Sequence, residues 1–348
     1  MMRLPHFRFL APRDVREAAD LLASTPGAML VAGGTDLLPN MKRRQQVPGT
    51  LVGLRRIAEL RAITGTASGS PANGDGLTIG AGVTLTELVR DGRIRQGYGA
   101  LWQAAAQIAT PHLRNMGTLG GNLCLDTRCN YYDQNYEWRK AIGFCMKKDG
   151  ETCWVATSSA KCLAVSSTDT APALLALGAR ITLVSADASR QLAVSDLYRN
   201  DGIFYLTRQP TEVLTAVHLP PLDSGWRSTY WKLRRRGSFD FPVLSVAAAA
   251  NIAADGTVEG ARIVLGAVTS RPMEVPAAAA ALAGQRITDE LIATAATLAA
   301  QPAKPMDNTD FTLVWRKRVT KDFVTYALRE LRGDDVRELR HRVSRMLL

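Results

Sequence analysis

The chain has 348 residues, 46% hydrophobic and 22% charged, which is typical of a globular protein large enough for two domains. Its formal charge of +11 is spread along the sequence without a zinc-finger, homeodomain or RNP-type motif, so we predict no nucleic-acid partner. No apolar run approaches the roughly 18 residues of a membrane span, and the first residues lack a signal-peptide pattern. We therefore expect a cytoplasmic protein with no membrane partner.

The first part of the chain alternates short helices and strands around two glycine loops. Asp14 is a suitable cap for a helix that reaches about Ser24. Asp169 is expected to cap a second helix, which ends at Gly178. The remaining expected elements are a helix over residues 99–109 and strands over residues 28–32, 50–54, 77–79, 180–184 and 212–219.

Residues 220–225, rich in Pro, Asp and Gly, form the best linker signal in the chain. Strands of one antiparallel sheet are expected beyond it, followed by helices, and this order predicts an α+β second domain. The expected strands are residues 229–235, 243–252 and 261–267, and the helices are residues 277–283, 289–300, 310–331 and 334–346. The predicted domains are residues 1–225 and 226–348.

The two glycine loops are the first features that indicate chemistry. One runs through Ala32-Gly33-Gly34-Thr35-Asp36 directly after a buried strand, and the other is Gly117-Thr118-Leu119-Gly120-Gly121-Asn122. Turns without bulky side chains expose backbone N–H groups, which bind phosphate oxygens. Neither loop is the G-x-G-x-x-G fingerprint, so a Rossmann fold is unsupported. Each alone is an ordinary turn, whereas the pair indicates a dinucleotide diphosphate held between two loops.

All five cysteines of the chain lie between Cys124 and Cys162, with gaps of 4, 15, 7 and 8 residues. Such clustering favours an iron–sulfur centre, because several thiolates must converge on one inorganic core. A structural zinc site is the second interpretation, since only one short C-x₄-C spacing is present. Disulfides belong to small secreted domains. Small buried hydrophobic residues are the remaining alternative.

Together with Asp169-Thr170-Ala171-Pro172, the two loops resemble the FAD subunit of molybdenum hydroxylases, the xanthine dehydrogenase and carbon monoxide dehydrogenase family. The resemblance covers nearly the whole chain. It implies an α+β fold: a two-part FAD domain of the vanillyl-alcohol oxidase (PCMH) type, then a C-terminal α/β domain like that of carbon monoxide dehydrogenase flavoproteins. The implied FAD-binding residues are Ala32, Gly33, Gly34, Thr35, Asp36, Thr118, Gly121, Asn122, Asp169, Leu214 and Lys232.

An insertion of about 40 residues, over residues 124–165, separates the second loop from the Asp169 helix. It resembles the medium subunit of 4-hydroxybenzoyl-CoA reductases, in Thr127-Arg128-Cys129-Asn130-Tyr131-Tyr132-Asp133 and in Phe144-Cys145-Met146-Lys147-Lys148. That resemblance implies a [4Fe–4S] cluster, with Cys124 left to the flavin loop. The implied iron ligands are Cys129, Cys145, Cys153 and Cys162.

The resemblance also implies a function and partners. FAD and the cluster would pass electrons from reduced ferredoxin to molybdenum, for reductive dehydroxylation of 4-hydroxybenzoyl-CoA in anaerobic aromatic degradation. A molybdopterin-binding large subunit and a [2Fe–2S] small subunit would complete a dimer of heterotrimers. Two alternatives stay open: an FAD subunit of an aldehyde- or purine-oxidising hydroxylase, and a zinc-stapled binding protein without a redox role.

Overall fold

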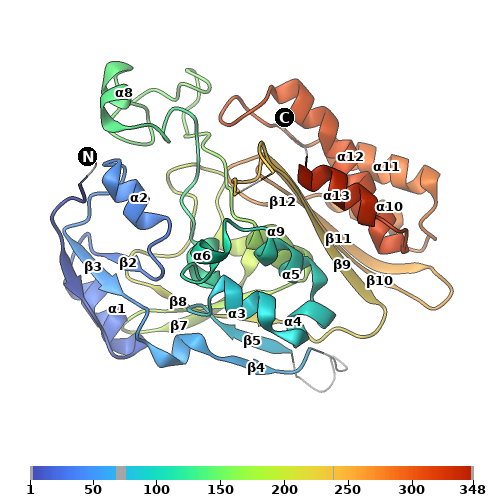
Figure 1. The fold of residues 1–348 in the computed structure, drawn as a ribbon, viewed down its shortest axis with the longest axis horizontal. Helices are drawn as coiled ribbons and strands as arrows, with labels where there is room; N and C mark the ends of the chain where they lie inside the picture. The colour runs from blue at the N-terminus through green and yellow to red at the C-terminus, as the bar shows by residue number, and fades with distance from the viewer. Residues whose placement is uncertain (1–2, 68–75, 238, 346–348) are drawn as a thin grey trace.

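A computed structural model describes residues 3–67, 76–237 and 239–345 of the chain. Helices and three separate β-sheets make up this part of the protein, so the predicted α+β fold is confirmed. Figure 1 shows the sheets following one another along the chain, with the longest helices in the C-terminal part.

The first sheet is parallel and has the strand order β1 (Arg8–Leu10), β3 (Thr50–Gly53), β2 (Met29–Val31). Helix α1 (Val15–Ser24) begins as predicted, since the Asp14 carboxylate accepts the backbone N–H of Glu17 at 2.7 Å. Its buried Val15, Ala18, Ala19 and Leu22 form a small core with β3. Helix α2 (Leu37–Lys42) follows the first glycine loop.

The second sheet is antiparallel, with the order β4 (Ile63–Gly65), β5 (Leu77–Gly80), β8 (Val213–Leu219), β6 (Arg180–Val184), β7 (Ser189–Ala193). A large hydrophobic core joins it to a group of short helices. The helices with residues in this core are α3 (Leu85–Arg90), α4 (Gly92–Gly97), α5 (Gly99–Ala106), α7 (Leu119–Leu123) and α9 (Thr170–Ala176), together with the 3₁₀ turn η3 (Val194–Leu197). Helix α6 (Pro111–Arg114) has no buried residue, and the 3₁₀ turn η1 (Ala58–Arg61) contributes Leu60 to the smaller core of α1 and β3.

The third sheet is antiparallel, as predicted, in the order β12 (Met273–Glu274), β11 (Val258–Gly266), β10 (Leu244–Ile252), β9 (Trp226–Leu233). It is covered on one face by α5 and α9 and on the other by C-terminal helices. Successive side chains of a strand point to opposite faces, so in β10 Ala247 and Ala249 join the first core while Val246 and Ala248 join the second. The C-terminal helices are α10 (Pro276–Leu282), α11 (Asp289–Ala300), α12 (Leu313–Arg332) and α13 (Arg337–Arg345).

The cysteine-containing insertion forms a lobe of its own around helix α8 (Tyr136–Ala141). Its two ends are joined by backbone hydrogen bonds between Arg128 and Val165, at 2.8 and 2.7 Å. In Figure 1 α8 lies at the rim of the molecule near α2. The buried guanidinium of Arg139 makes that contact, donating to the carbonyls of Arg43 and Arg44 at 3.1 and 3.3 Å.

The structure corrects parts of the elements expected from sequence. Residues 119–123 of the second glycine loop are helical, because the Thr118 hydroxyl accepts the N–H of Gly121 at 3.1 Å and starts α7. Helix α5 ends at Ala106 rather than at residue 109. Strands β1, β4, β7 and β12 were not expected. Among the described helices, none has the length and apolar character needed to cross a bilayer.

Candidate functional site

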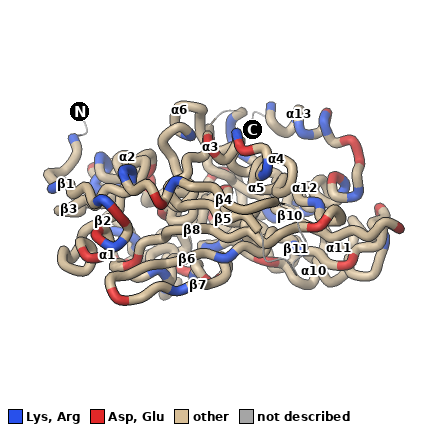
Figure 2. Tube along the Cα trace, turned by 90° about the horizontal axis from the view of Figure 1, so that it is seen from below, with Lys and Arg blue, Asp and Glu red and all other residues tan. Residues whose placement is uncertain are grey.

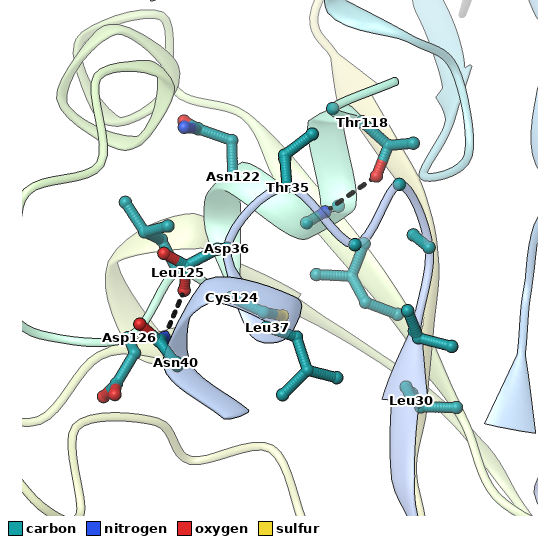
Figure 3. A pocket seen from close by; sticks show the side chains of 18 of the residues that line it. Leu30, Thr35, Asp36, Leu37, Asn40, Thr118, Asn122, Cys124, Leu125 and Asp126 are labelled. Carbon is teal, nitrogen blue, oxygen red and sulfur yellow. Dashed lines mark hydrogen bonds between the residues drawn. The ribbon is translucent and has the colours of Figure 1, made fainter. Parts of the chain in front are cut away.

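A cavity of about 1120 Å³ lies between the first and second sheets and extends to the second domain. Figure 3 shows the first loop, α7 and the start of the insertion meeting around it. All predicted FAD-binding residues except Lys232 line this cavity, and so does Cys124. Residues as far apart in the sequence as Ala32 and Leu214 are thus brought to one space, but the role of each toward FAD remains a prediction.

The two glycine loops touch each other through their backbones. A Cβ atom on Gly33 would lie 1.8 Å from the Met116 carbonyl oxygen, so only glycine fits there. Gly34 has φ +71°, a left-handed conformation that favours glycine. Within the described residues, no backbone carbonyl accepts the N–H groups of residues 33–36. These donors sit at the cavity wall, where a diphosphate would satisfy them.

Asn122 is held rigidly at the same wall. Its Oδ1 atom accepts three hydrogen bonds: from the Thr168 hydroxyl at 2.9 Å and from the backbone N–H and hydroxyl of Thr170 at 3.1 and 2.7 Å. These donors orient the amide so that Nδ2 is the end available to a ligand. Asn122 and Thr118 are both buried, which suits a dry binding site.

Asp169 does not cap α9 with its side chain, so that prediction is wrong. Its carboxylate instead forms a buried ion pair with the Lys232 ammonium at 3.0 Å and accepts the Tyr230 hydroxyl at 2.6 Å. Burial raises the pKa of Asp169 and lowers the pKa of Lys232, and the charge of each opposes the shift of the other. Lys232 also donates to the carbonyl of Gln107 at 3.2 Å. It therefore lies behind Asp169, joining the second domain to the cavity wall.

Leu214 reaches the cavity because of a break in strand register. In the pairing of β6 with β8, Thr182 faces Ala216, but the next residue, Leu183, faces Leu214. Thr215 therefore has no partner position in β6. Such a bulge redirects side chains next to binding sites. Leu214 is buried and presents an apolar surface to the cavity.

Arg128 is a cavity residue that sequence reasoning did not assign. Its guanidinium contacts the carboxylate of Asp36, pairs with Asp133 at 3.1 Å and stacks over the Phe241 ring at 4.7 Å. Because a diphosphate repels a carboxylate, Arg128 offsets the negative charge of Asp36 within the first loop. The sequence feature that points to Arg128 is its position directly before Cys129.

The four predicted iron ligands are buried, and none forms a disulfide. Cys129, Cys145 and Cys162 pack in one cluster with Tyr132 and Ala164. The pKa of Cys162 is raised to about 11, mainly by burial and to a smaller extent by Cys153 and Cys145. The pKa of Cys129 is raised to about 12, again mainly by burial, with smaller contributions from Cys162 and Cys145. Three of the four thiols therefore share one packed cluster, and Cys153 is near enough to Cys162 to affect its pKa.

Local sequence explains how these thiols are presented. Cys129, Cys145 and Cys153 each begin a tight turn, in which the cysteine carbonyl accepts the N–H three residues later at 2.9, 2.9 and 3.1 Å. The N–H of Ala164 donates to the Cys162 sulfur at 3.4 Å, as second-sphere donors do in iron–sulfur sites. The donor chemistry thus fits a cluster. In the described part of the chain, however, no group of three or more His, Cys, Asp or Glu side chains is arranged to hold a metal ion. The [4Fe–4S] cluster therefore stays a prediction.

Comparison with known families identifies the first domain. Residues 5–222 match the family described as "FAD binding domain in molybdopterin dehydrogenase". The chain belongs to this family. Residues 228–331 match the C-terminal domain of carbon monoxide dehydrogenase flavoproteins. The protein is thus an FAD-binding oxidoreductase subunit of the xanthine dehydrogenase and carbon monoxide dehydrogenase type of molybdenum hydroxylase, with the predicted order of domains.

Individual members of the family resemble the chain over most of its length. The aldehyde oxidoreductase FAD-binding subunit of Escherichia coli is 34% identical, over 80% of this chain and 87% of the relative. The nicotine 6-hydroxylase medium subunit of Paenarthrobacter nicotinovorans is 26% identical, over 83% of this chain and 84% of the relative. A chain of carbon monoxide dehydrogenase from Hydrogenophaga pseudoflava superposes with a TM-score of 0.75 at 25% identity, covering 94% of this chain and 97% of that one.

Proposed function

We propose that this FAD-binding subunit also carries a [4Fe–4S] cluster on Cys129, Cys145, Cys153 and Cys162, and that it transfers electrons between FAD and that cluster. The observation that carries the proposal is four buried free thiols gathered in an insertion whose first residues line the FAD cavity. When bound, flavin handles electrons singly or in pairs and a cluster handles them one at a time, so together they link two kinds of redox partner.

The residues of this chain have separate tasks in that scheme. Backbone N–H groups of residues 33–36 would bind the FAD diphosphate, and Arg128 would balance the Asp36 charge beside it. Asn122 and Asp169 would line the flavin site, and Leu214 would pack against the ring system. Lys232 would hold Asp169 in place from the second domain.

Metal analysis and cysteine substitution test the cluster. The protein purified without oxygen should contain FAD and about four irons per chain. Replacing any one of the four proposed ligands by Ser should lower the iron content and leave FAD bound. Cys124→Ser is the matched control, because Cys124 lines the FAD cavity, and it should retain iron. Zinc in place of iron, in a protein without flavin colour, would support the zinc-stapled alternative instead.

We propose 4-hydroxybenzoyl-CoA reductase as the activity of the complete complex, on the sequence of the insertion. A molybdopterin-binding large subunit and a [2Fe–2S] small subunit would supply the remaining centres in a dimer of heterotrimers. The second candidate is aldehyde oxidation, favoured by the 34% identity to an aldehyde oxidoreductase subunit. Assays of the purified complex separate them: benzoyl-CoA formed from 4-hydroxybenzoyl-CoA with reduced ferredoxin supports the first, and oxidation of aromatic aldehydes supports the second.

Ferredoxin, as an acidic electron donor, would dock on basic residues of the chain. Figure 2 shows Lys and Arg distributed along the trace from α2 to α13. Basic residues on or beside the insertion include the run Lys42-Arg43-Arg44, held against α8, and Lys140 of α8, which is exposed. The electron-transfer rate should fall as salt rises, and further in Lys140→Glu. A rate indifferent to ionic strength would exclude charge-guided docking.

A further inference from the structure

A buried ion pair between Lys147 and Asp126 lies in the insertion, and neither residue has been given a role so far. The Lys147 ammonium is 2.8 Å from Asp126 Oδ1, and the two side chains are 6% and 8% exposed. The ammonium also donates to the Thr127 hydroxyl at 2.8 Å and to the Gly202 carbonyl at 2.6 Å. Asp126 Oδ2 accepts the Tyr132 hydroxyl at 2.9 Å. The two charges are therefore fixed in place, although buried pairs contribute little net stability.

The positive end of this pair faces the cysteines. Lys147 Nζ lies 4.8 Å from the centre of the Tyr132 ring, which packs against Cys129, Cys145 and Cys162. Gly202, whose carbonyl accepts from Nζ, is so close to Cys162 that an added Cβ would be 2.6 Å from its sulfur.

The negative end faces the FAD cavity. Asp126 is one of the residues lining it, and Figure 3 shows Asp126 beside Asn40 at the cavity wall. Tyr205 also lines the cavity, and its ring centre is 5.4 Å from Lys147 Nζ. The Lys147 ammonium is thus near two aromatic rings, Tyr132 of the cysteine cluster and Tyr205 of the cavity.

We propose that the Lys147–Asp126 pair is an oriented electrostatic element that favours an electron on the cluster over an electron on the flavin. This inference rests on the proposed [4Fe–4S] cluster. Reduction adds one negative charge to the cluster; the ammonium on its side stabilises that charge, because interactions in a buried site are weakly screened. The carboxylate on the cavity side opposes added negative charge on FAD. The pair therefore favours transfer of one electron from reduced FAD to the oxidised cluster.

Redox titration of the purified holoprotein tests this, with the reduced cluster followed by electron paramagnetic resonance and FAD by visible absorbance. Lys147→Met should lower the ratio of reduced to oxidised cluster at fixed potential by about tenfold, equal to about 59 mV for a one-electron centre. Lys148→Met is the matched control. Lys148 follows Lys147 in the chain, but its side chain is 35% exposed and is paired with exposed Asp149, so the ratio of reduced to oxidised cluster should stay unchanged. Asp126→Asn should raise the ratio, because the ammonium is then unopposed.

Opposite shifts of this ratio in the two variants indicate an effect of charge, because loss of packing alone would not shift it in opposite directions. Iron and FAD contents are measured first for each protein. If Lys147→Met loses iron, Asp126→Asn still carries the test, because it retains the ammonium. Native iron content with no shift in either variant, or shifts of the same sign, would overturn the ion-pair role while leaving the cluster in place. A wild-type protein without iron would overturn both.

Discussion

The ion pair between Asp169 and Lys232 yields a prediction about stability and FAD binding together. The two side chains are 4% and 1% exposed, so replacing Lys232 by Met leaves a carboxylate buried with only the Tyr230 hydroxyl as partner. Removing one member of a buried ion pair costs about 3–5 kcal/mol in stability. Both side chains are shielded from water, so the solvent does not screen the charge that remains. The free energy of unfolding should fall by about that amount, and FAD retention should fall with it.

Urea unfolding of the wild-type and variant proteins, with and without FAD, measures this. Arg235→Met is the matched control from the same part of the chain. Arg235 pairs with Asp310 at 3.0 Å, but the side chains are 59% and 39% exposed, so the expected loss is at most about 1 kcal/mol. The double variant Asp169→Asn/Lys232→Met should lose less than the sum of the single variants. A Lys232→Met protein as stable as Arg235→Met would refute the assignment of a charged buried pair.

Three further perturbations follow from the geometry. Gly33→Ala should lose FAD, measured as flavin absorbance per chain, because its Cβ would overlap the Met116 carbonyl; Gly49→Ala, with open space around it, should not. Thr118→Ala should cost about 1 kcal/mol in urea unfolding through loss of the α7 cap. Burial lowers the pKa of His218 below its ordinary value of 6.5, so as pH falls the unfolded chain binds a proton there before the folded chain does. Stability should therefore decline as pH falls below about 6.5, and His218→Gln should flatten that decline in urea unfolding at different pH.

Periodic patterns predicted the elements of this fold well where packing agreed with local sequence. Strand β6 and helix α11 occupy the predicted residues, and the Asp14 cap forms as expected. Short strands such as β7 and β12 escaped prediction, because β7 is mostly exposed and carries no apolar alternation. The start of α7 also escaped prediction: two glycines argue against a helix locally, and the cap on Thr118 together with close packing against Ala81 outweighs them.

The cavity-lining residues followed from family resemblance, but their physical roles did not. Asp169 stood at a position where sequence suggests a helix cap, yet its partners Tyr230 and Lys232 are more than 60 positions away, in the second domain. No local sequence pattern predicts a contact between residues so far apart in the chain. The same holds for Arg128, whose partner Asp36 belongs to the first glycine loop, and for Thr215, which the register shift leaves without a partner position in β6.

The position of the insertion in the chain explains how one segment would serve both FAD and the proposed cluster. Arg128 and Val165 pair at its base, so its ends are tied together while its turns are free to present thiols. That same base reaches the FAD cavity through Asp126 and Arg128. A cysteine cluster placed elsewhere on the surface would have needed a separate route to the flavin. Because the segment begins at the end of α7, which forms a wall of the cavity, proximity between the two sites follows directly from the order of elements along the chain.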